Sequence, residues 1–286
     1  MTGSLLLAIN SITLGGVLFL LAAGFSLIFG LMRIPNLMHG SFFMLGAYVS
    51  VSLLRAGINF WAAALLASLA VAGLGGIIER YMLRRLAGQE LAQVLVTLGL
   101  SFIMADLCLI GWTGDPIQVP TPPSLLGAVP IFGIFFPLYR LAVVVIAVLM
   151  VIVLWLALEK TRLGAKIRAG VDDSAMARVC GIPVSRLFTT VFCLGAGLAG
   201  LGGVIGAPIL SVYPGLDSDM LPLALIVVIL GGAGSLPGAL LGSLVVGTLY
   251  NFGLALTPEL AYVVLFLPML LVLVFRPQGL LGRRAQ

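Results

Sequence analysis

Long runs of apolar residues, separated by short polar segments, dominate the chain. About 20 apolar residues are enough to cross the hydrocarbon core of a bilayer as an α-helix, and the alternation typical of a membrane β-barrel does not occur. The pattern predicts an all-α, polytopic transmembrane helical bundle with 8–9 spans, folded as a single domain over residues 1–286. The seventh run is short and is expected to be a full span or a broken, re-entrant helix. The expected spans are residues 5–31, 37–54, 60–79, 92–111, 137–158, 185–209, 218–235, 238–256 and 260–275.

The basic residues indicate the orientation. If the N-terminus lies outside, 13 of the 15 Lys and Arg residues fall on one side and only Arg55 and Arg140 on the other. Cytoplasmic loops carry an excess of such residues, so the C-terminus and the 159–183 loop are predicted to be cytoplasmic. The 13 residues are Arg33, Arg80, Arg84, Arg85, Lys160, Arg162, Lys166, Arg168, Arg178, Arg186, Arg276, Arg283 and Arg284.

The longest polar interruption is this 159–183 loop. Asp172 is expected to cap a short helix over residues 175–180, because an N-cap carboxylate accepts from the free N–H groups of the first turn. Gly181, followed by Pro183, is expected to end that helix.

Small side chains recur along the same segment, since Val171, Ala175 and Val179 lie at i, i+4 and i+8. A short helix outside the membrane with so narrow a face suits docking onto another protein. An ordinary solvated loop between two membrane helices is the alternative.

Polar residues at membrane depth are costly and each needs a reason. Asn36 and His39 are expected near the inner face between the first two spans, where Pro35 breaks the helix. Non-helical backbone is tolerated in membranes where it lines a cavity or packs against protein. Asn36 and His39 could therefore have a functional role, or they could belong to a turn with a purely structural role. Thr97 and Ser101 are expected to bond carbonyls of the preceding turn.

Other features exclude several kinds of site. The only histidine is His39, so a multi-histidine metal site is excluded, and Cys108, Cys180 and Cys193 lack metal-ligand spacing and are interpreted as small core residues. Asp106 lies toward the outer end of its span, where its carboxylate is expected to reach water.

The composition, with 61% hydrophobic and 9% charged residues, excludes a soluble domain. The net charge of +5 is explained by the basic residues on the predicted cytoplasmic side and does not indicate nucleic-acid binding. The glycine-rich run from Gly231 to Gly238 lacks the Lys-Ser/Thr ending of a phosphate loop and is interpreted as a kinked gate or tight helix junction.

No catalytic triad, paired carboxylates or nucleotide site is evident, so the chain is not expected to be an enzyme. Three classes stay open on the residues alone: a channel-forming subunit driven by a partner, an ion-coupled secondary carrier, and a structural subunit of a membrane enzyme complex. Ion coupling usually needs intramembrane carboxylates. The 159–183 loop, whose short helix suits docking onto another protein, favours the channel-forming subunit driven by a partner.

Five stretches, in order and spacing, resemble the permease subunits of bacterial ABC importers for branched-chain amino acids, of the LivH type. Together they cover nearly the whole chain. They are Gly24-Phe-Ser-Leu-Ile-Phe-Gly30 with Asn36-Leu-Met-His-Gly40 and Leu45-Gly-Ala-Tyr48; Thr97-Leu-Gly99; Thr161-Arg-Leu-Gly164 with Arg168-Ala169 and Gly181-Ile182; Gly231-Gly-Ala-Gly-Ser-Leu-Pro-Gly238; and Arg276-Pro-Gln-Gly-Leu-Leu-Gly282.

The resemblance implies a second permease subunit (a related chain or a second copy), two cytoplasmic ABC ATPases and an extracytoplasmic substrate-binding protein, all working at a lipid membrane. ATP and Mg²⁺ would be bound by the ATPases, with no cofactor in this chain. Outer loops around Asp115 and Asp217–Asp219 would face the binding protein, where carboxylates could meet basic groups. The implied ATPase-coupling residues are Arg168, Asp172, Ala175, Arg178 and Gly181, and the implied translocation-pathway residues are Asn36, His39 and Thr97.

Two departures from the family pattern concern the substrate and the coupling helix. Relatives tend to have Asn-Phe-Ala-His-Gly where this chain has Asn36-Leu-Met-His-Gly40, which leaves urea, short amides and aromatic carboxylates as alternative substrates. They also tend to have Asn where this chain has Pro183, which stiffens the exit from the coupling helix.

Overall fold

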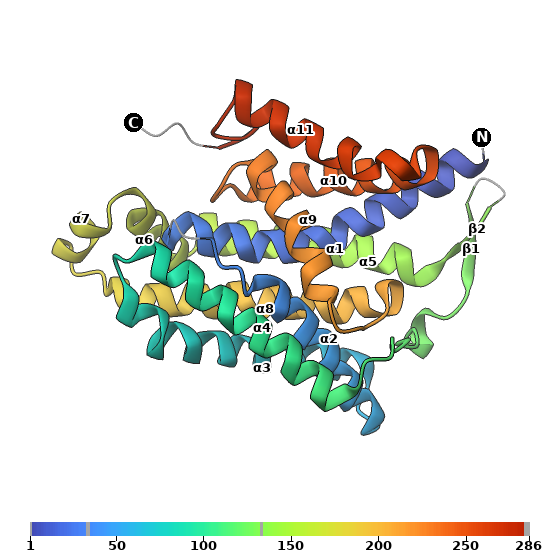
Figure 1. The fold of residues 1–286 in the computed structure, drawn as a ribbon, viewed down its shortest axis with the longest axis horizontal. Helices are drawn as coiled ribbons and strands as arrows, with labels where there is room; N and C mark the ends of the chain where they lie inside the picture. The colour runs from blue at the N-terminus through green and yellow to red at the C-terminus, as the bar shows by residue number, and fades with distance from the viewer. Residues whose placement is uncertain (1, 33–34, 132–133, 283–286) are drawn as a thin grey trace.

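The computed structural model describes residues 2–32, 35–131 and 134–282. Most of its helices run along the long axis of the molecule (Figure 1). The helices are α1 (Thr2–Met32), α2 (His39–Arg55), α3 (Phe60–Tyr81), α4 (Glu90–Trp112), α5 (Leu138–Lys160), α6 (Arg162–Asp172), α7 (Ser174–Val179), α8 (Val184–Leu210), α9 (Leu216–Gly231), α10 (Leu236–Leu256) and α11 (Ala261–Phe275). Shorter elements are η1 (Leu83–Leu86), η2 (Pro123–Leu125), η3 (Pro258–Leu260), β1 (Ala128–Ile131) and β2 (Ile134–Pro137).

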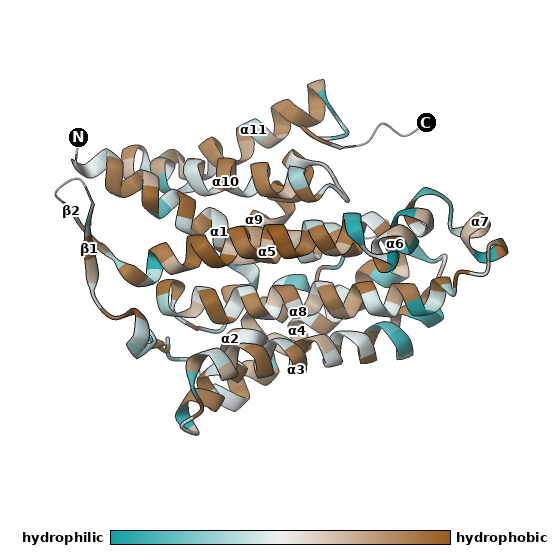
Figure 2. Ribbon diagram, turned by 180° about the vertical axis from the view of Figure 1, so that it is seen from behind, coloured by the Kyte–Doolittle hydropathy of each residue, from teal (hydrophilic) through white to brown (hydrophobic). Residues whose placement is uncertain are grey.

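The bundle has two distinct ends. One carries the N-terminus and the β1–β2 hairpin, and we call it the hairpin end; the other carries α6 and α7, and we call it the α7 end (Figure 1). Hydrophobic residues cover the long helices between them, and hydrophilic residues gather around α6 and α7 (Figure 2). Arg33, Arg283 and Arg284, which the orientation argument used, lie outside the described residues.

Seven helices of the described chain are long and apolar enough to cross a membrane. They correspond to predicted spans, and their bounds differ from the predicted ones by at most two residues, except that Phe60–Leu86 continues seven residues beyond the predicted end at 79. The two remaining predicted spans, 37–54 and 218–235, correspond to α2 and α9, which have only 17 and 16 residues. The seven helices are Gly3–Met32, Phe60–Leu86, Glu90–Trp112, Leu138–Lys160, Val184–Leu210, Leu236–Leu256 and Pro258–Phe275.

Helix α2 begins inside the bundle. His39, its first residue, places Nε2 2.9 Å from the carbonyl oxygen of Leu21. Leu21 lies 11 residues before Met32, the last residue of α1, which corresponds to about 16 Å along a helix. The predictions that residues 37–54 form a full span and that His39 lies near the inner face are therefore wrong.

Helix α9 begins beside the start of α2. Ser41 of α2 donates a hydrogen bond of 3.0 Å to Asp217 in the first turn of α9. At its other end α9 leads into the glycine-rich turn before α10, where Gly232 and Gly234 have φ values of 101° and 76°. The predicted tight helix junction is present, and Gly30 of α1 packs against Gly234 in it.

The core is held by close helix contacts at glycines. A Cβ atom on Gly24 of α1 would collide with the backbone of Gly195 on α8, and one on Gly46 of α2 with the backbone of Gly200. Small residues at these crossings let helix backbones approach closely in lipid. Helices α1 and α8 are accordingly the most buried of the span-capable helices, at 83% and 67% of their apolar windows.

The proline-rich segment before α5 holds the only strands of the described chain, which the all-α prediction did not include. Strands β1 and β2 pair antiparallel, with Ala128 opposite Pro137 and Ile131 opposite Ile134. An isolated bridge between Ile117 and Val212 ties this segment to the end of α8.

Candidate functional site

The polar loop between α5 and α8 contains two helices. Thr161 caps α6, since its hydroxyl accepts from Gly164 N at 3.2 Å. Asp173 caps α7, since its Oδ1 accepts from Ala175 N at 2.8 Å and Met176 N at 2.9 Å. The prediction that Asp172 is the cap is wrong, because Asp172 is the last residue of α6.

Gly181 ends α7 as predicted. Its φ is +79°, a left-handed value that favours glycine, and its N–H donates to the Arg178 carbonyl at 3.0 Å. The N–H of Ile182 donates to the Ala177 carbonyl at 3.0 Å, which satisfies a second free carbonyl of the last turn.

Helix α7 is largely exposed. Ala175 and Arg178 are exposed, and Val179 is 83% exposed, a high value for a valine. Val171 belongs to α6 and packs partly buried against the cluster around Leu31. The turn at Asp173 separates it from the other two, so the predicted continuous face of Val171, Ala175 and Val179 is wrong.

The five predicted coupling residues divide into two groups. Asp172, Ala175, Arg178 and Gly181 are exposed at or beside α7. Arg168 instead turns back toward the end of α5, where it lies 3.5 Å from Glu159 and donates to the Leu158 carbonyl.

One of the three cysteines departs from expectation. Cys108 is buried and Cys193 half-buried, but Cys180 is exposed and is not a core residue. Asp106 is exposed on α4, six residues before Trp112. The expectation that its carboxylate reaches water beyond the outer end of its span stays a prediction.

The three predicted pathway residues are all buried in the bundle. Thr97 on α4 accepts a hydrogen bond from Leu37 N at 3.3 Å, so it contacts the segment that leads into α2. Asn36 Oδ1 accepts from Met38 N at 3.2 Å. Thr97 also bonds its own preceding turn, as Ser101 does, which confirms that expectation.

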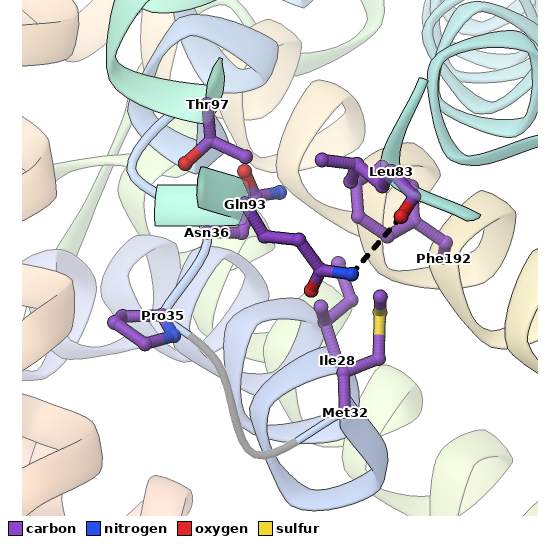
Figure 3. A pocket seen from close by; sticks show the side chains of 8 residues that line it. All are labelled: Ile28, Met32, Pro35, Asn36, Leu83, Gln93, Thr97 and Phe192. Atoms are coloured by element: carbon purple, nitrogen blue, oxygen red, sulfur yellow. Dashed lines mark hydrogen bonds between the residues drawn. The ribbon is translucent and has the colours of Figure 1, made fainter. Parts of the chain in front are cut away.

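Asn36 and Thr97 line one pocket, and His39 does not. His39 is 0% exposed and packs between the rings of Phe25 and Phe42, with centroids 5.3 and 6.3 Å away. The pocket has room for about 10 Å³, roughly one water molecule. Its lining residues are Ile28, Met32, Pro35, Asn36, Leu83, Gln93, Thr97 and Phe192 (Figure 3).

Gln93 is a polar pocket residue that the sequence reasoning missed. It is 3% exposed, and its Nε2 donates to the Leu83 carbonyl at 2.9 Å. It lies one turn before Thr97 on α4, and that spacing is the signal that could have identified it.

A second cavity, of about 770 Å³, lies at the α7 end, and we call it the vestibule. Its lining combines Arg84 of η1 with Arg178 of α7, Gly181 of the connection and Arg186 of α8. The vestibule therefore adjoins the exposed surface of α7. Its full lining is Met32, Glu79, Leu83, Arg84, Ala87, Gly88, Gln93, Arg178, Gly181, Ile182, Pro183, Val184, Ser185, Arg186 and Phe188.

No group of three or more His, Cys, Asp or Glu residues in the described part of the chain could hold a metal ion. The arrangement offers instead an exposed short helix, an adjoining vestibule and a small polar pocket within the bundle. These features suit a membrane protein that moves a solute.

Comparison with known proteins identifies the family. The model of the branched-chain amino acid transport system permease component matches residues 7–273. The chain belongs to this family. With its seven span-capable helices, it is a multi-pass permease of the bacterial inner membrane.

Individual relatives agree over nearly the whole chain. The high-affinity branched-chain amino acid transport system permease protein BraD of Pseudomonas aeruginosa is 29% identical, covering 96% of this chain and 94% of BraD. LivH of Salmonella typhimurium is 28% identical, covering 96% and 94%. LivM of the same organism is 28% identical, covering 96% of this chain and 70% of LivM. No solved structure matches the chain.

Proposed function

We propose that this chain is the transmembrane permease subunit of an ATP-driven (ABC) importer for branched-chain amino acids. In this role it forms part of the translocation pathway and couples to cytoplasmic ATPase subunits, and it is not itself an enzyme. The observation that carries the proposal is the exposed helix α7 with its unusually exposed Val179, in a chain of this permease family. Met176 of the same helix is 58% exposed, and an exposed apolar patch outside the spans is suited to a protein contact.

The α7 end is proposed to be cytoplasmic, with the N-terminus and the hairpin end outside. Arg84, Arg178 and Arg186 all lie at the α7 end, and the positive-inside rule places such residues in the cytoplasm. On this topology the seven long helices cross the membrane, and α2 and α9 are partial helices within a single transmembrane domain over residues 1–286.

A second permease subunit is the first proposed partner. LivH and LivM of Salmonella typhimurium, two permeases of one organism, are both similar to this chain, which supports a pathway made by a pair of related chains. Two ABC ATPases, which bind ATP and Mg²⁺, and an extracytoplasmic binding protein complete the proposed importer. No nucleic acid takes part.

For the residues, we assign Asp172, Ala175, Arg178 and Gly181 to the ATPase contact and Arg168 to the support of α6 beneath it. Asn36 and Thr97 are assigned to the pathway, since both line the pocket. His39, whose Nε2 contacts the Leu21 carbonyl, is assigned to holding the start of α2. Urea, short amides or aromatic carboxylates are the alternative substrates, and an ion-coupled carrier is the alternative mechanism.

The test is Ala175→Glu, which places a charge on the exposed surface of α7. In proteoliposomes containing the assembled complex, we expect uptake to fall more than tenfold while the subunit still inserts and binds less ATPase. The matched control is Ala56→Glu, at the exposed C-cap of α2 near the hairpin end, which should transport normally. Normal uptake and ATPase binding by Ala175→Glu would refute the coupling role. Uptake that collapses with a protonophore at constant ATP would favour the ion-coupled carrier.

A further inference from the structure

Two buried amides in the pocket have one polar atom each without a partner in the described chain. Asn36 Oδ1 accepts from Met38 N, which leaves Nδ2 unpaired. Gln93 Nε2 donates to the Leu83 carbonyl, which leaves Oε1 unpaired. These backbone partners fix which way each amide is turned. The pocket therefore offers one hydrogen-bond donor and one acceptor.

Both side chains are only 3% exposed. Buried polar groups in proteins are almost always hydrogen-bonded, and ordered water supplies the partner where protein atoms do not. The pocket has about 10 Å³ of room, which suits one water molecule and is far too small for an amino acid. In Figure 3 the Gln93 side chain extends across the pocket to its bond with Leu83.

The pocket and the vestibule share three lining residues, Met32, Leu83 and Gln93. Met32 and Leu83 are apolar, and Leu83 is 2% exposed. These two side chains therefore form the apolar part of the boundary between the pocket and the vestibule, which we call the barrier, and Gln93 forms its polar part.

The barrier is attached to the start of α8 through η1. Leu83 is the first residue of η1, and Arg84 follows it. The Arg84 guanidinium donates to the Ser185 carbonyl at 2.9 Å and to the Thr189 hydroxyl, both near the start of α8. Only a short connection from Cys180 to Pro183 separates α8 from α7. A displacement of α7 can thus reach Leu83 through a few contacts.

We propose that Asn36 and Gln93 bind a buried water molecule, and that Met32 and Leu83 form the inner gate separating this site from the vestibule. The water occupies the site in the closed arrangement. When η1 moves with α8, the gate opens and the polar site joins the vestibule. The interpretation of the barrier as a gate rests on the proposed transport function. The water site and the barrier themselves do not depend on that function.

The barrier is tested by the accessibility of Thr97→Cys, in a background where Cys108, Cys180 and Cys193 are replaced by alanine. The probe is methanethiosulfonate ethylammonium, applied to the assembled complex without nucleotide. We expect slow labelling of Thr97→Cys and fast labelling of Ser185→Cys, which lines the vestibule. Adding Leu83→Ala, or separately Met32→Ala, should speed labelling at position 97 at least tenfold.

The matched control is Leu86→Ala, a half-buried leucine of η1 that lines neither cavity; it should leave the labelling rate unchanged. Labelling of Thr97→Cys as fast as Ser185→Cys would overturn the barrier, as would no acceleration in both the Leu83 and the Met32 variant. These rates need no transport, so a failed importer assignment is distinguishable from a failed barrier.

The water site is tested by cryo-electron microscopy of the assembled complex at a resolution that reveals ordered water. We expect density within about 3.2 Å of Asn36 Nδ2 and Gln93 Oε1. That density should be lost in Gln93→Met, which preserves size but removes the acceptor. A map that reveals other buried waters but none at this site would overturn the assignment.

Discussion

The carboxylate of Glu79 and the guanidinium of Arg84 lie 3.2 Å apart where α3 ends and η1 begins. Glu79 is 1% exposed, and the same carboxylate oxygen accepts from the Thr189 hydroxyl of α8 at 2.6 Å. The pair therefore fastens the α7 ends of α3 and α8 to each other. A buried carboxylate without its cation would be strongly destabilising.

The first prediction is that Arg84→Ala lowers the free energy of unfolding by about 1–3 kcal/mol, because it removes a charged hydrogen-bond donor from a buried acceptor. Thermal unfolding of the purified protein in detergent measures this. Arg85→Ala, at the exposed neighbouring position, is the control and should be neutral. Adding Glu79→Gln to Arg84→Ala should restore part of the loss. If the double variant is less stable than the single one, the ion pair is not the cause.

The second prediction concerns Asp217, a buried carboxylate at the start of α9. Its Oδ2 accepts from Ser41, and its Oδ1 has no partner among the described residues. Ionisable residues buried in membrane proteins are rare and usually functional. We expect Asp217→Asn, which retains an acceptor for Ser41, to be at least as stable as wild type but to transport at least tenfold more slowly.

Asp219→Asn is the control for this prediction, since Asp219 lies in the same turn but is exposed. Its uptake should remain near wild type. Wild-type transport by Asp217→Asn would contradict a role of Asp217 in transport and would leave it only the structural role of joining α2 to α9.

The third prediction uses two glycines in membrane helices. A Cβ on Gly46 would lie 2.5 Å from the Gly200 Cα, whereas a Cβ on Gly73 meets nothing within 4 Å. Gly46→Ala should therefore lower stability by roughly 1–3 kcal/mol, the usual cost of overpacking. Gly73→Ala should be neutral or slightly stabilising, because alanine favours helices. Equal thermal unfolding temperatures for the two variants would contradict the α2–α8 contact.

The sequence was sufficient to predict most bounds of the long helices to within a few residues, because each is a mostly apolar run bounded by polar or turn residues. It was not sufficient for α2, whose apolar run resembles that of a full span. The depth at which α2 begins depends on a contact with Leu21, 18 positions away in the sequence. Local hydrophobicity does not encode that contact.

In the candidate site, too, some features could be predicted from the local sequence and others could not. The stop at Gly181 was predictable because glycine followed by proline is a local signal. The cap was not, because Asp172 and Asp173 are adjacent carboxylates and both suit an N-cap. Asp173 has extended backbone, with φ −150° and ψ 103°, and this leaves Asp172 to complete α6. The Asn36–Gln93 pocket joins residues from three parts of the chain, so no single stretch could predict it.

The fourth prediction concerns Gly181, where φ is +79° and a Cβ would meet nothing within 4 Å. Backbone conformation, rather than space, therefore limits substitution. Asparagine tolerates this region, while β-branched residues do not, and proline is locked near −65°. Substrate-stimulated ATPase activity and uptake of the assembled complex should fall in the order Gly, Asn, Ala, Val, Pro, with Pro abolishing uptake.

Gly57 provides the matched control, because its φ is +80° and its surroundings are equally open, but it lies in the turn between α2 and α3, next to Ala56. Gly57→Val and Gly181→Val should lower stability by a similar amount, about 1–2 kcal/mol. Only Gly181→Val should also lower substrate-stimulated ATPase activity and uptake, because only Gly181 sets the direction in which the chain leaves α7 and enters α8. If both variants impair coupling equally, general destabilisation explains the effect and the special role of the α7 end is refuted.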